Sequence, residues 1–374
     1  MIQDDDGLAY IGPPKLNPKE APVILTFSSG TTGLPKAVVH THYGIITSIM
    51  QLTHPTSLKF SLEDIVLSTY PFCHLSALMI LCAVIKNNAS LVVAPCYDFD
   101  LVLKVIPQHK PNVFLTIVSF VYKLLMDPKV QDYDLTSIKE IVTVGAPLNW
   151  KANEEVIMNT FPFLQSVRQA YGLSETILLS IMVKGSVLPN SVGKLVSSTE
   201  LKVIDITTGV TLGPNECGEI YVRGEQMMKG YLNNPKITSE TITTDGWLVT
   251  GDYGYYDLEG NVYITDRIKE MIKTEFYQVS PIEIESLLCS HPAVGDAAVI
   301  GIVDSSLEEV PRGYVVLKQG CKVEPAELIQ FVSDRVSHPK RLRGGIEVLD
   351  KIPRSEMGKI QRKILQNYYY QNYK

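Results

Sequence analysis

The order of apolar segments along the chain constrains the fold more than any other feature of the sequence. In the first half of the chain, short apolar runs typical of buried strands, at residues 90–96 and 140–147, alternate with longer runs of helical character, at residues 99–110 and 118–127. This alternation is typical of α/β folds, in which helices cover a layered sheet. We therefore expect a large domain of layered α/β sheets, with a first buried strand at residues 22–27.

The pattern changes after residue 186. Residues 186–266 contain alternating strands separated by turns rich in Gly, Pro and Asn, including a hairpin with its turn at residues 259–261, and this section is predicted to be antiparallel and barrel-like. From residue 268 the α/β pattern returns, and Ser280 followed by Pro and Glu is the signature of a helix start. The expected organisation is a lead-in at 1–21, a large domain at 22–267 and a small α+β domain at 268–374.

Composition excludes several classes of protein. The chain has 374 residues, and its net charge of −6 argues against nucleic acid as a partner, because surfaces that bind nucleic acid carry an excess of Lys and Arg. The six cysteines form no C-x-x-C pair and have no zinc-ligand spacing, which predicts reduced thiols in an intracellular, soluble protein. The longest apolar run, at residues 75–85, is too short to span a bilayer and is predicted to be a buried helix. We expect no secretory leader and no S-K-L type address.

One polar loop is a candidate phosphate-binding site. The stretch LTFSSGTTGLPK at residues 25–36 combines hydroxyl side chains, glycines whose backbone N–H groups can close around an anion, and a lysine suited to phosphate. The candidate residues are Ser28, Ser29, Gly30, Thr31, Thr32 and Lys36. Their spacing differs from the G-x-x-x-x-G-K-[ST] phosphate loop. From these residues alone, an anion-binding loop and an ordinary polar turn between a strand and a helix both remain open.

Three other stretches contain candidate residues that also have ordinary structural interpretations. In RQAYGLSET, Tyr171 can stack on a planar ring and Glu175 can hold a hydrated Mg²⁺, although Ser and Glu are also common where a helix begins. Asp252, in GWLVTGDYG, can accept hydrogen bonds from ribose hydroxyls or can simply be a turn aspartate. His74, in YPFCHLSA, is a lone histidine beside an apolar segment, and such a residue is more often structural than catalytic.

Eight motifs in a fixed order favour the functional interpretations. SSGTTGLPK, PFCH, VGAPL, YGLSET, GEIYVRG, GWLVTGD, DRIKEMIK and PRSEMGK resemble, in sequence and spacing, the adenylate-forming (AMP-binding) acyl-CoA synthetase superfamily, and within it the 4-coumarate–CoA ligase and beetle luciferase branch. The resemblance extends from about residue 22 to residue 365. It implies an acid–thiol ligase that uses ATP and Mg²⁺ to convert an aromatic or fatty acid to an acyl-adenylate and then passes the acyl group to CoA. It also implies small-molecule partners and a cytoplasmic or peroxisomal location.

The resemblance further implies roles for individual residues. The polar loop would hold the β- and γ-phosphates, Ser174 would contact the α-phosphate, and Glu175 would hold the metal ion. Lys359, His74 and Glu175 would be the catalytic residues, with Lys359 bridging the carboxylate and the phosphate. Lys269 would be the hinge of a mobile C-terminal domain. The remaining implied contacts are Gln169 and Tyr171 with adenine and the acyl group, Asp252 and Arg267 with the ribose, His74, Val144, Gly145 and Gly172 with the acyl group, and Lys273 and Gln278 on the loop that approaches for thioester formation.

Two positions depart from the family pattern where CoA would bind. The family motif K-x-K-G-[FY]-Q corresponds here to KTEFYQ at residues 273–278, so that Glu275 replaces a lysine and Phe276 replaces a glycine. Reversing a charge replaces attraction to an anionic ligand by repulsion. We therefore expect thioester formation to be impaired more than adenylation.

The start of the chain is a second departure. The family carries a long segment before the phosphate loop, whereas here that loop begins at residue 28. Either the chain is a fragment or an N-terminally truncated form, or the missing strands leave exposed edges that need cover. Two alternative functions stay open at this point: a non-catalytic relative that binds nucleotide, and a luciferase-like monooxygenase.

Overall fold

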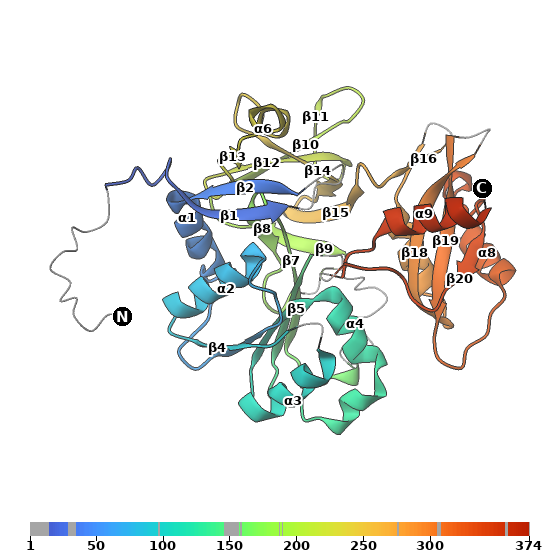
Figure 1. Cartoon of the computed structure of the whole chain (residues 1–374), viewed down its shortest axis with the longest axis horizontal. Helices are drawn as coiled ribbons and strands as arrows, with labels where there is room; N and C mark the ends of the chain where they lie inside the picture. The colour runs from blue at the N-terminus through green and yellow to red at the C-terminus, as the bar shows by residue number, and fades with distance from the viewer. Residues whose placement is uncertain are drawn as a thin grey trace.

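Two parts of unequal size lie side by side in the computed structural model (Figure 1). The larger part extends to residue 267, and the smaller part is drawn in orange and red. The structure describes residues 15–28, 35–95, 98–145, 157, 159–186, 188, 190–274, 277–304, 308–355 and 358–373. The mixed α/β architecture, with a large sheet-rich part and a small C-terminal part, confirms the expected fold class at this level.

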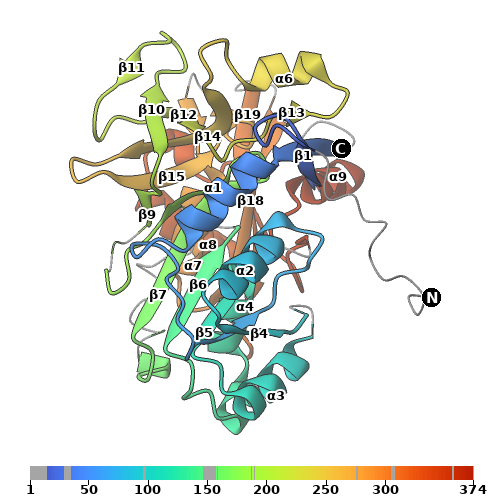
Figure 2. The same ribbon diagram turned by 90° about the vertical axis from the view of Figure 1, so that its left-hand side faces the viewer.

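Five parallel strands form one half of a twelve-stranded sheet. They are β3 (Ile65–Ser68), β4 (Ser90–Val93), β5 (Val113–Ile117), β6 (Glu140–Val144) and β7 (Ser166–Leu173). The accompanying helices are α1 (His42–Leu52), α2 (Leu75–Lys86), α3 (Phe99–His109), α4 (Val118–Met126) and the 3₁₀ helix η1 (Pro128–Asp132). Figure 2 shows α1 and α2 crossing in front of this sheet. The strands and helices predicted in this region are therefore present, and β5 is buried along its whole length, as a strand covered on both faces should be.

Antiparallel strands continue the same sheet beyond β7. They are β8 (Ile177–Ile181), β9 (Ser191–Leu195), β10 (Thr199–Ile204), β11 (Thr211–Leu212), β12 (Gly218–Gly224), β14 (Leu248–Tyr256) and β15 (Asn261–Arg267). The antiparallel pairing and the hairpin between β14 and β15 agree with the sequence prediction. A barrel is not seen, because the described strands pair in an open order that ends at β11. Alternating apolar residues specify a half-buried strand, but they do not specify whether the sheet closes.

A separate three-stranded sheet frames the polar loop. It contains β1 (Pro22–Ser28), β2 (Lys36–Thr41) and β13 (Gly230–Tyr231), and the short helix α6 (Pro235–Thr241) follows it. Among the described strands, β1 pairs only with β2, so one of its edges is open. The outward-facing side chains of β1, Val23, Leu25 and Phe27, are 43%, 50% and 67% exposed. β1 therefore has an open edge and, separately, an exposed apolar face.

The smaller part has a sheet and apolar clusters of its own. Its strands are β16 (Ile272–Thr274), β17 (Tyr277–Val279), β18 (Val294–Asp304), β19 (Glu308–Leu317) and β20 (Ile346–Val348). Its helices are α7 (Pro281–Cys289), α8 (Pro325–Ser333), η2 (His338–Lys340) and α9 (Arg362–Tyr373). The predicted cap is present, since the Ser280 hydroxyl accepts a hydrogen bond from the backbone N–H of Glu283. None of the described helices is both long and apolar enough to cross a membrane.

A buried carboxylate joins the two parts. Asp266, at the end of β15, accepts hydrogen bonds from the Ser280 hydroxyl (2.5 Å) and from the backbone N–H of Ile282 (3.3 Å), both at the start of α7. Burial raises the pKa of Asp266 to about 6, against the opposing effect of these hydrogen bonds and of Arg362. The last strand of the large part therefore caps the first helix of the small part.

A buried ion pair fixes β6 against β7. Arg168 and Glu140 are each 3% exposed, and the Nε of Arg168 donates to Glu140 at 2.6 Å. Arg168 also donates to the backbone carbonyls of Ser57 (3.0 Å) and Met182 (3.2 Å). Lys184 adds an outer contact to Glu140 at 2.7 Å, but its side chain is 57% exposed. Removing one member of a buried pair strands the other charge away from water.

We predict that Arg168→Met lowers the free energy of unfolding by about 3–5 kcal/mol, because Glu140 stays buried without its main partner. Urea denaturation measures this loss. Lys184→Met is the matched control and should cost less than about 1 kcal/mol, since an exposed ion pair contributes little. Equal effects of the two substitutions would contradict the assignment.

Candidate active site

The candidate residues gather where the sheet changes from parallel to antiparallel. β7 pairs in parallel with β6 and antiparallel with β8, so it is the junction between the two halves. The motif residues Gly172 to Glu175 lie at and just beyond the carboxyl end of β7. In open α/β sheets, ligands bind beyond the carboxyl ends of parallel strands, and the topology alone thus marks this edge.

A carboxylate, a phenol and a guanidinium meet across three strands. Asp252 lies on β14 directly opposite Arg267 on β15, and the Nε of Arg267 contacts its Oδ1 at 2.6 Å. The hydroxyl of Tyr171, on β7, donates to Oδ2 at 2.5 Å. Asp252 is only 2% exposed, and burial raises its pKa, against the opposing effects of Arg267 and Tyr171. Each carboxylate oxygen has two lone pairs, so Asp252 keeps acceptor capacity for further hydroxyl groups.

The turn after β7 is held by contacts from the three-stranded sheet. Tyr231, on β13, donates its hydroxyl to the Oε1 of Glu175 at 2.8 Å. The backbone N–H of Met228 donates to the Glu175 carbonyl at 2.8 Å. Lys36 lies 5.1 Å from the centre of the Tyr231 ring, which brings the lysine of the polar loop over the residue that orients Glu175. The two motifs, far apart in sequence, therefore meet through Tyr231.

Glycine is required where this turn closes. A Cβ at Gly172 would lie 1.8 Å from the carbonyl oxygen of Ile177, far inside van der Waals contact. Ile177 itself has φ of +61°, a region that β-branched residues rarely adopt. Such strain persists only where the surroundings impose it, and it concentrates at functional sites.

The segment after β20 reaches the same edge of the sheet. Gly358 has φ of +76°, and a Cβ there would lie 2.5 Å from the Oγ of Ser119 at the start of α4. The Gly358 carbonyl accepts a hydrogen bond from Arg354 at 2.7 Å. Lys359 follows directly, and its backbone N–H donates to the Ser355 hydroxyl at 3.2 Å. A chain reversal in the small part thus packs against the large part and carries Lys359 with it.

Lys359 is surrounded by charges of both signs. Desolvation and the nearby Arg267 lower the pKa of Lys359, while Asp252, Glu270 and Glu175 act in the opposite direction. The ammonium group is therefore within electrostatic range of both Asp252 and Glu175. The arrangement can hold an anionic ligand between the Lys359 ammonium and the Asp252 and Glu175 carboxylates, which would bind its hydroxyl groups and its metal ion.

Other predicted residues lie along the same edge without being part of this cluster. His74 precedes α2, in the connection after β3, Val144 ends β6, and Gly145 follows it. Gln169 is buried within β7. These positions all follow or approach the carboxyl ends of neighbouring parallel strands, where a substrate would lie.

The residues expected to serve the second step are in the small part. Lys269 is exposed on the turn that follows β15. Lys273 and Gln278 are exposed and face each other across the β16–β17 hairpin. The candidate residues Ser29, Gly30, Thr31, Thr32, Glu275 and Phe276 are outside the described residues.

Two residues of the cluster were missed in the sequence analysis. Tyr231 belongs to the GYLNNP stretch, which has no signal beyond a turn, yet it contacts both Glu175 and Lys36. Glu270 follows the expected hinge, and its carboxylate joins Arg362 of α9 at 3.1 Å while acting on Lys359. An alternating charge pattern in DRIKE could have suggested Glu270, but nothing local could have suggested Tyr231.

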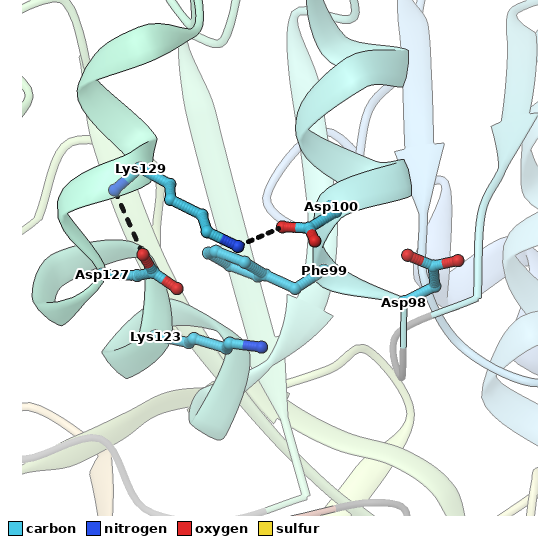
Figure 3. A pocket seen from close by; sticks show the side chains of 6 residues that line it. All are labelled: Asp98, Phe99, Asp100, Lys123, Asp127 and Lys129. Carbon is cyan, nitrogen blue, oxygen red and sulfur yellow. Dashed lines mark hydrogen bonds and ion pairs between the residues drawn. The ribbon is translucent and has the colours of Figure 1, made fainter.

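A pocket of about 350 Å³ lies elsewhere, at the far end of α4 (Figure 3). Its charged groups already have structural partners. Asp98 caps α3 by accepting from Leu101 at 2.9 Å, and Asp127 accepts from the backbone N–H of Lys129 at 3.1 Å. Lys129 pairs with Asp100 at 3.5 Å. These contacts explain the polar lining as helix capping, so we place the functional site at the Asp252–Glu175–Lys359 cluster instead.

Comparison with known proteins gives two family matches. Residues 3–232 match the model of the AMP-binding enzyme family, and residues 283–359 match the model of the AMP-binding enzyme C-terminal domain.

Longer relatives agree with these matches. 4-Coumarate–CoA ligase 4 of Arabidopsis thaliana is 36% identical over 94% of this chain, and luciferin 4-monooxygenase of Photuris pensylvanica is 37% identical over 96%. The chain spans only 62% and 66% of the length of these two relatives. Among solved structures, ATP-bound MatB from Rhodopseudomonas palustris superimposes with a TM-score of 0.84 at 25% identity, over 94% of this chain and 68% of that one.

We predict that Gly172→Ala lowers the free energy of unfolding by about 3 kcal/mol, because the added methyl group would overlap the Ile177 carbonyl. Chemical denaturation provides the measurement. Gly44→Ala, in α1, is the matched control, since the nearest atom to its Cβ would be 3.4 Å away. It should be neutral, or should stabilise by about 0.5–1 kcal/mol, because alanine favours a helix. A harmless Gly172→Ala would show that the turn is not closed as described.

Proposed function

The chain belongs to the AMP-binding enzyme family, and on this premise we propose that it activates a carboxylic acid with ATP and transfers the acyl group to CoA. The observation that carries the proposal is the convergence of Asp252, Glu175 and Lys359 at the carboxyl end of β7. Aromatic and fatty acids are the proposed substrates.

We assign the nucleotide contacts from the positions of the side chains. Asp252 would accept the ribose hydroxyls, with Arg267 and Tyr171 holding its carboxylate in place. Ser174 would donate to the α-phosphate. The polar loop from Ser28 to Lys36 would surround the β- and γ-phosphates, because hydroxyl groups, backbone N–H groups and one ammonium suit that ligand.

Glu175 fits a magnesium ion that is shared with phosphate oxygens. In the described part of the chain, no group of three or more His, Cys, Asp or Glu side chains could hold a metal alone. Mg²⁺ commonly takes one or two carboxylates and completes its shell with water and substrate phosphates. When bound, the ion would neutralise phosphate charge during the reaction. The task of this chain is to aim the carboxylate, which the Tyr231 hydroxyl does.

Lys359 would make the first step possible by bringing two anions together. A carboxylate oxygen attacks the α-phosphorus, the bond to the pyrophosphate oxygen breaks, and pyrophosphate leaves with the electron pair. A positioned ammonium stabilises the charge that builds up in this transition state. In the second step the CoA thiolate would attack the acyl carbon, and AMP would leave with the carbon–oxygen bond pair.

The small part would turn between these two steps. Lys269, on the turn between the parts, is the proposed hinge, and rotation there would remove Lys359 and bring the hairpin with Lys273 and Gln278 to the site. His74, Val144 and Gly145 would line the acyl group.

ATP–pyrophosphate exchange against a panel of aromatic and fatty acids tests the proposal. Exchange that depends on one class of acid is the expected result. ATP binding by calorimetry without exchange would instead support a non-catalytic nucleotide-binding relative. Light emission with luciferin would favour the monooxygenase alternative.

We predict that Lys359→Gln lowers the exchange rate by about 100-fold or more, because a lost electrostatic contact to the transition state costs roughly this factor. The Kd for ATP should change little by comparison.

The pH dependence of the exchange rate tests whether the positive charge of Lys359 is required. The pKa of Lys359 is lowered, so the charged form is lost as pH rises through that lowered value. Exchange should therefore decline on the alkaline side. Arginine stays protonated, so Lys359→Arg should keep whatever rate it has to higher pH. Identical alkaline limbs in the two proteins would rule out Lys359 as the titrating group.

The β16–β17 hairpin contains the feature that we expect to impair the proposed transfer to CoA. Glu309 accepts a hydrogen bond from the backbone N–H of Lys273 at 2.9 Å, so a carboxylate already lies at the base of the hairpin whose tip is Glu275-Phe276 in sequence. Anionic CoA would meet negative charge there.

We predict that Glu275→Lys combined with Phe276→Gly raises thioester formation about 10–100-fold, the equivalent of one regained charge-assisted hydrogen bond. The exchange rate should stay within about twofold. Glu324→Lys, the same charge change at an exposed site before α8, is the control and should not reproduce the gain. Wild-type thioester formation as fast as adenylation would contradict this prediction.

A further inference from the structure

A buried histidine connects the polar loop to the turn that carries Ser174 and Glu175. His40, on β2, has no exposed surface. Its Nε2 lies 2.8 Å from the carbonyl oxygen of Ser174. A carbonyl can only accept, so the proton is on Nε2 and Nδ1 carries a lone pair. His40 therefore holds the backbone of the turn, in addition to the contacts from Met228 and Tyr231.

The same face of β2 runs from the polar loop to this histidine. Side chains two residues apart share one face of a strand, so Lys36, Val38 and His40 point the same way. Val38 is fully buried, which shows that this face is the inner one. Lys36 contacts Tyr231, and Tyr231 contacts Glu175. Strand β2 thus contacts the Ser174–Glu175 turn directly at His40 and indirectly at Lys36, through Tyr231.

The second ring nitrogen of His40, Nδ1, lowers the stability of the folded chain because it is buried without a hydrogen bond. Among the described atoms, Nδ1 of His40 is buried and has no hydrogen-bond partner. Desolvation lowers the pKa of His40, against smaller opposing effects of the Ser174 carbonyl and the Glu175 charge, so the ring stays neutral and Nε2 stays the donor. A leucine of similar volume would remove this unpaired nitrogen, but it would also leave the Ser174 carbonyl without the donor that holds it. The stability gained from the one hydrogen bond is therefore offset by the unpaired nitrogen, and a buried polar residue with so little net gain calls for a functional reason.

We propose that His40 is a positioning residue for MgATP: its hydrogen bond to the Ser174 carbonyl sets the turn so that Ser174 and Glu175 face the phosphates held by the loop at the other end of β2. This inference rests on the proposed function for the identity of the ligand. It concerns binding of the triphosphate and its metal, and it does not involve the ribose contacts of Asp252.

The test compares two ligands by calorimetry. His40→Leu removes the donor and should raise the Kd for MgATP about tenfold, while the Kd for adenosine, which lacks phosphates, stays within about twofold. The melting temperature of the variant should change little, because removal of the unpaired nitrogen offsets loss of the hydrogen bond to Ser174. A purely structural role would give a lower melting temperature and a similar loss of affinity for both ligands.

Two further variants make the result specific. His40→Gln can donate to the same carbonyl, so its Kd for MgATP should be close to that of the wild type, and this variant also serves if His40→Leu does not fold. Thr26→Val is the matched control. Thr26 is on the neighbouring strand, opposite Val38, and faces the same side as His40, and its Oγ1 is likewise buried without a hydrogen-bond partner among the described atoms. It should leave both Kd values unchanged.

The outcomes separate this inference from the proposed function. MgATP affinity equal to wild type in His40→Leu, equal weakening of MgATP and adenosine, or a Kd in His40→Gln as poor as in His40→Leu would each overturn it. If the wild type binds MgATP but catalyses no exchange with any acid, only the proposed function fails. If the wild type does not bind MgATP, both fail.

Discussion

The contact between Asp252 and Arg267 is the interaction on which the site depends. It joins β14 to β15 at the point where the large part of the chain ends, and Tyr171 ties the same carboxylate to β7. One buried charge therefore sets the positions of three strands. Because Arg267 also acts on Lys359, the same pair sets the electrostatic environment of a residue from the small part. Displacing either member would alter both the strand edge and the lysine that approaches it.

Buried polar contacts lie on the small part's side of this centre. Arg362, at the start of α9, joins Glu270 after β15 and Glu285 on α7, all within the small part. Asp266 adds its hydrogen bonds to the start of α7. The groups named at the junction are polar and mostly buried, in contrast to the apolar clusters on either side. Polar interfaces between domains permit relative movement more easily than large apolar ones do.

Much of the architecture could be predicted from local pattern. The strands at β4 and β6 and the helices α2, α3 and α4 follow from periodicity, and the start of α7 follows from Ser280 and its neighbours. The expected barrel-like character of residues 186–266 is not shown by the described strands, because an alternating strand has the same appearance in an open sheet. The candidate site shows the same division. Motifs indicated Asp252, Glu175 and Lys359, and the structure brings them together, whereas their roles remain proposals. Tyr231 and His40 could not be found, because their significance comes from pairing across about 50 to 130 residues, which no local pattern records.

The pairing of β2 with β13 also has a consequence for biosynthesis. Val38 and Val39 pair with Tyr231 and Gly230, so the sheet that frames the polar loop is incomplete until residue 231 has left the ribosome. Roughly 190 residues separate the partners, which at ~5–20 residues per second corresponds to a delay of about 10–40 s. During that interval β1 and β2 form at most a hairpin with apolar side chains on both faces. The nascent chain therefore exposes the apolar side chains of an incomplete two-stranded sheet before β13 has been synthesised. Its yield in cells should depend on chaperones that bind exposed apolar segments early in synthesis.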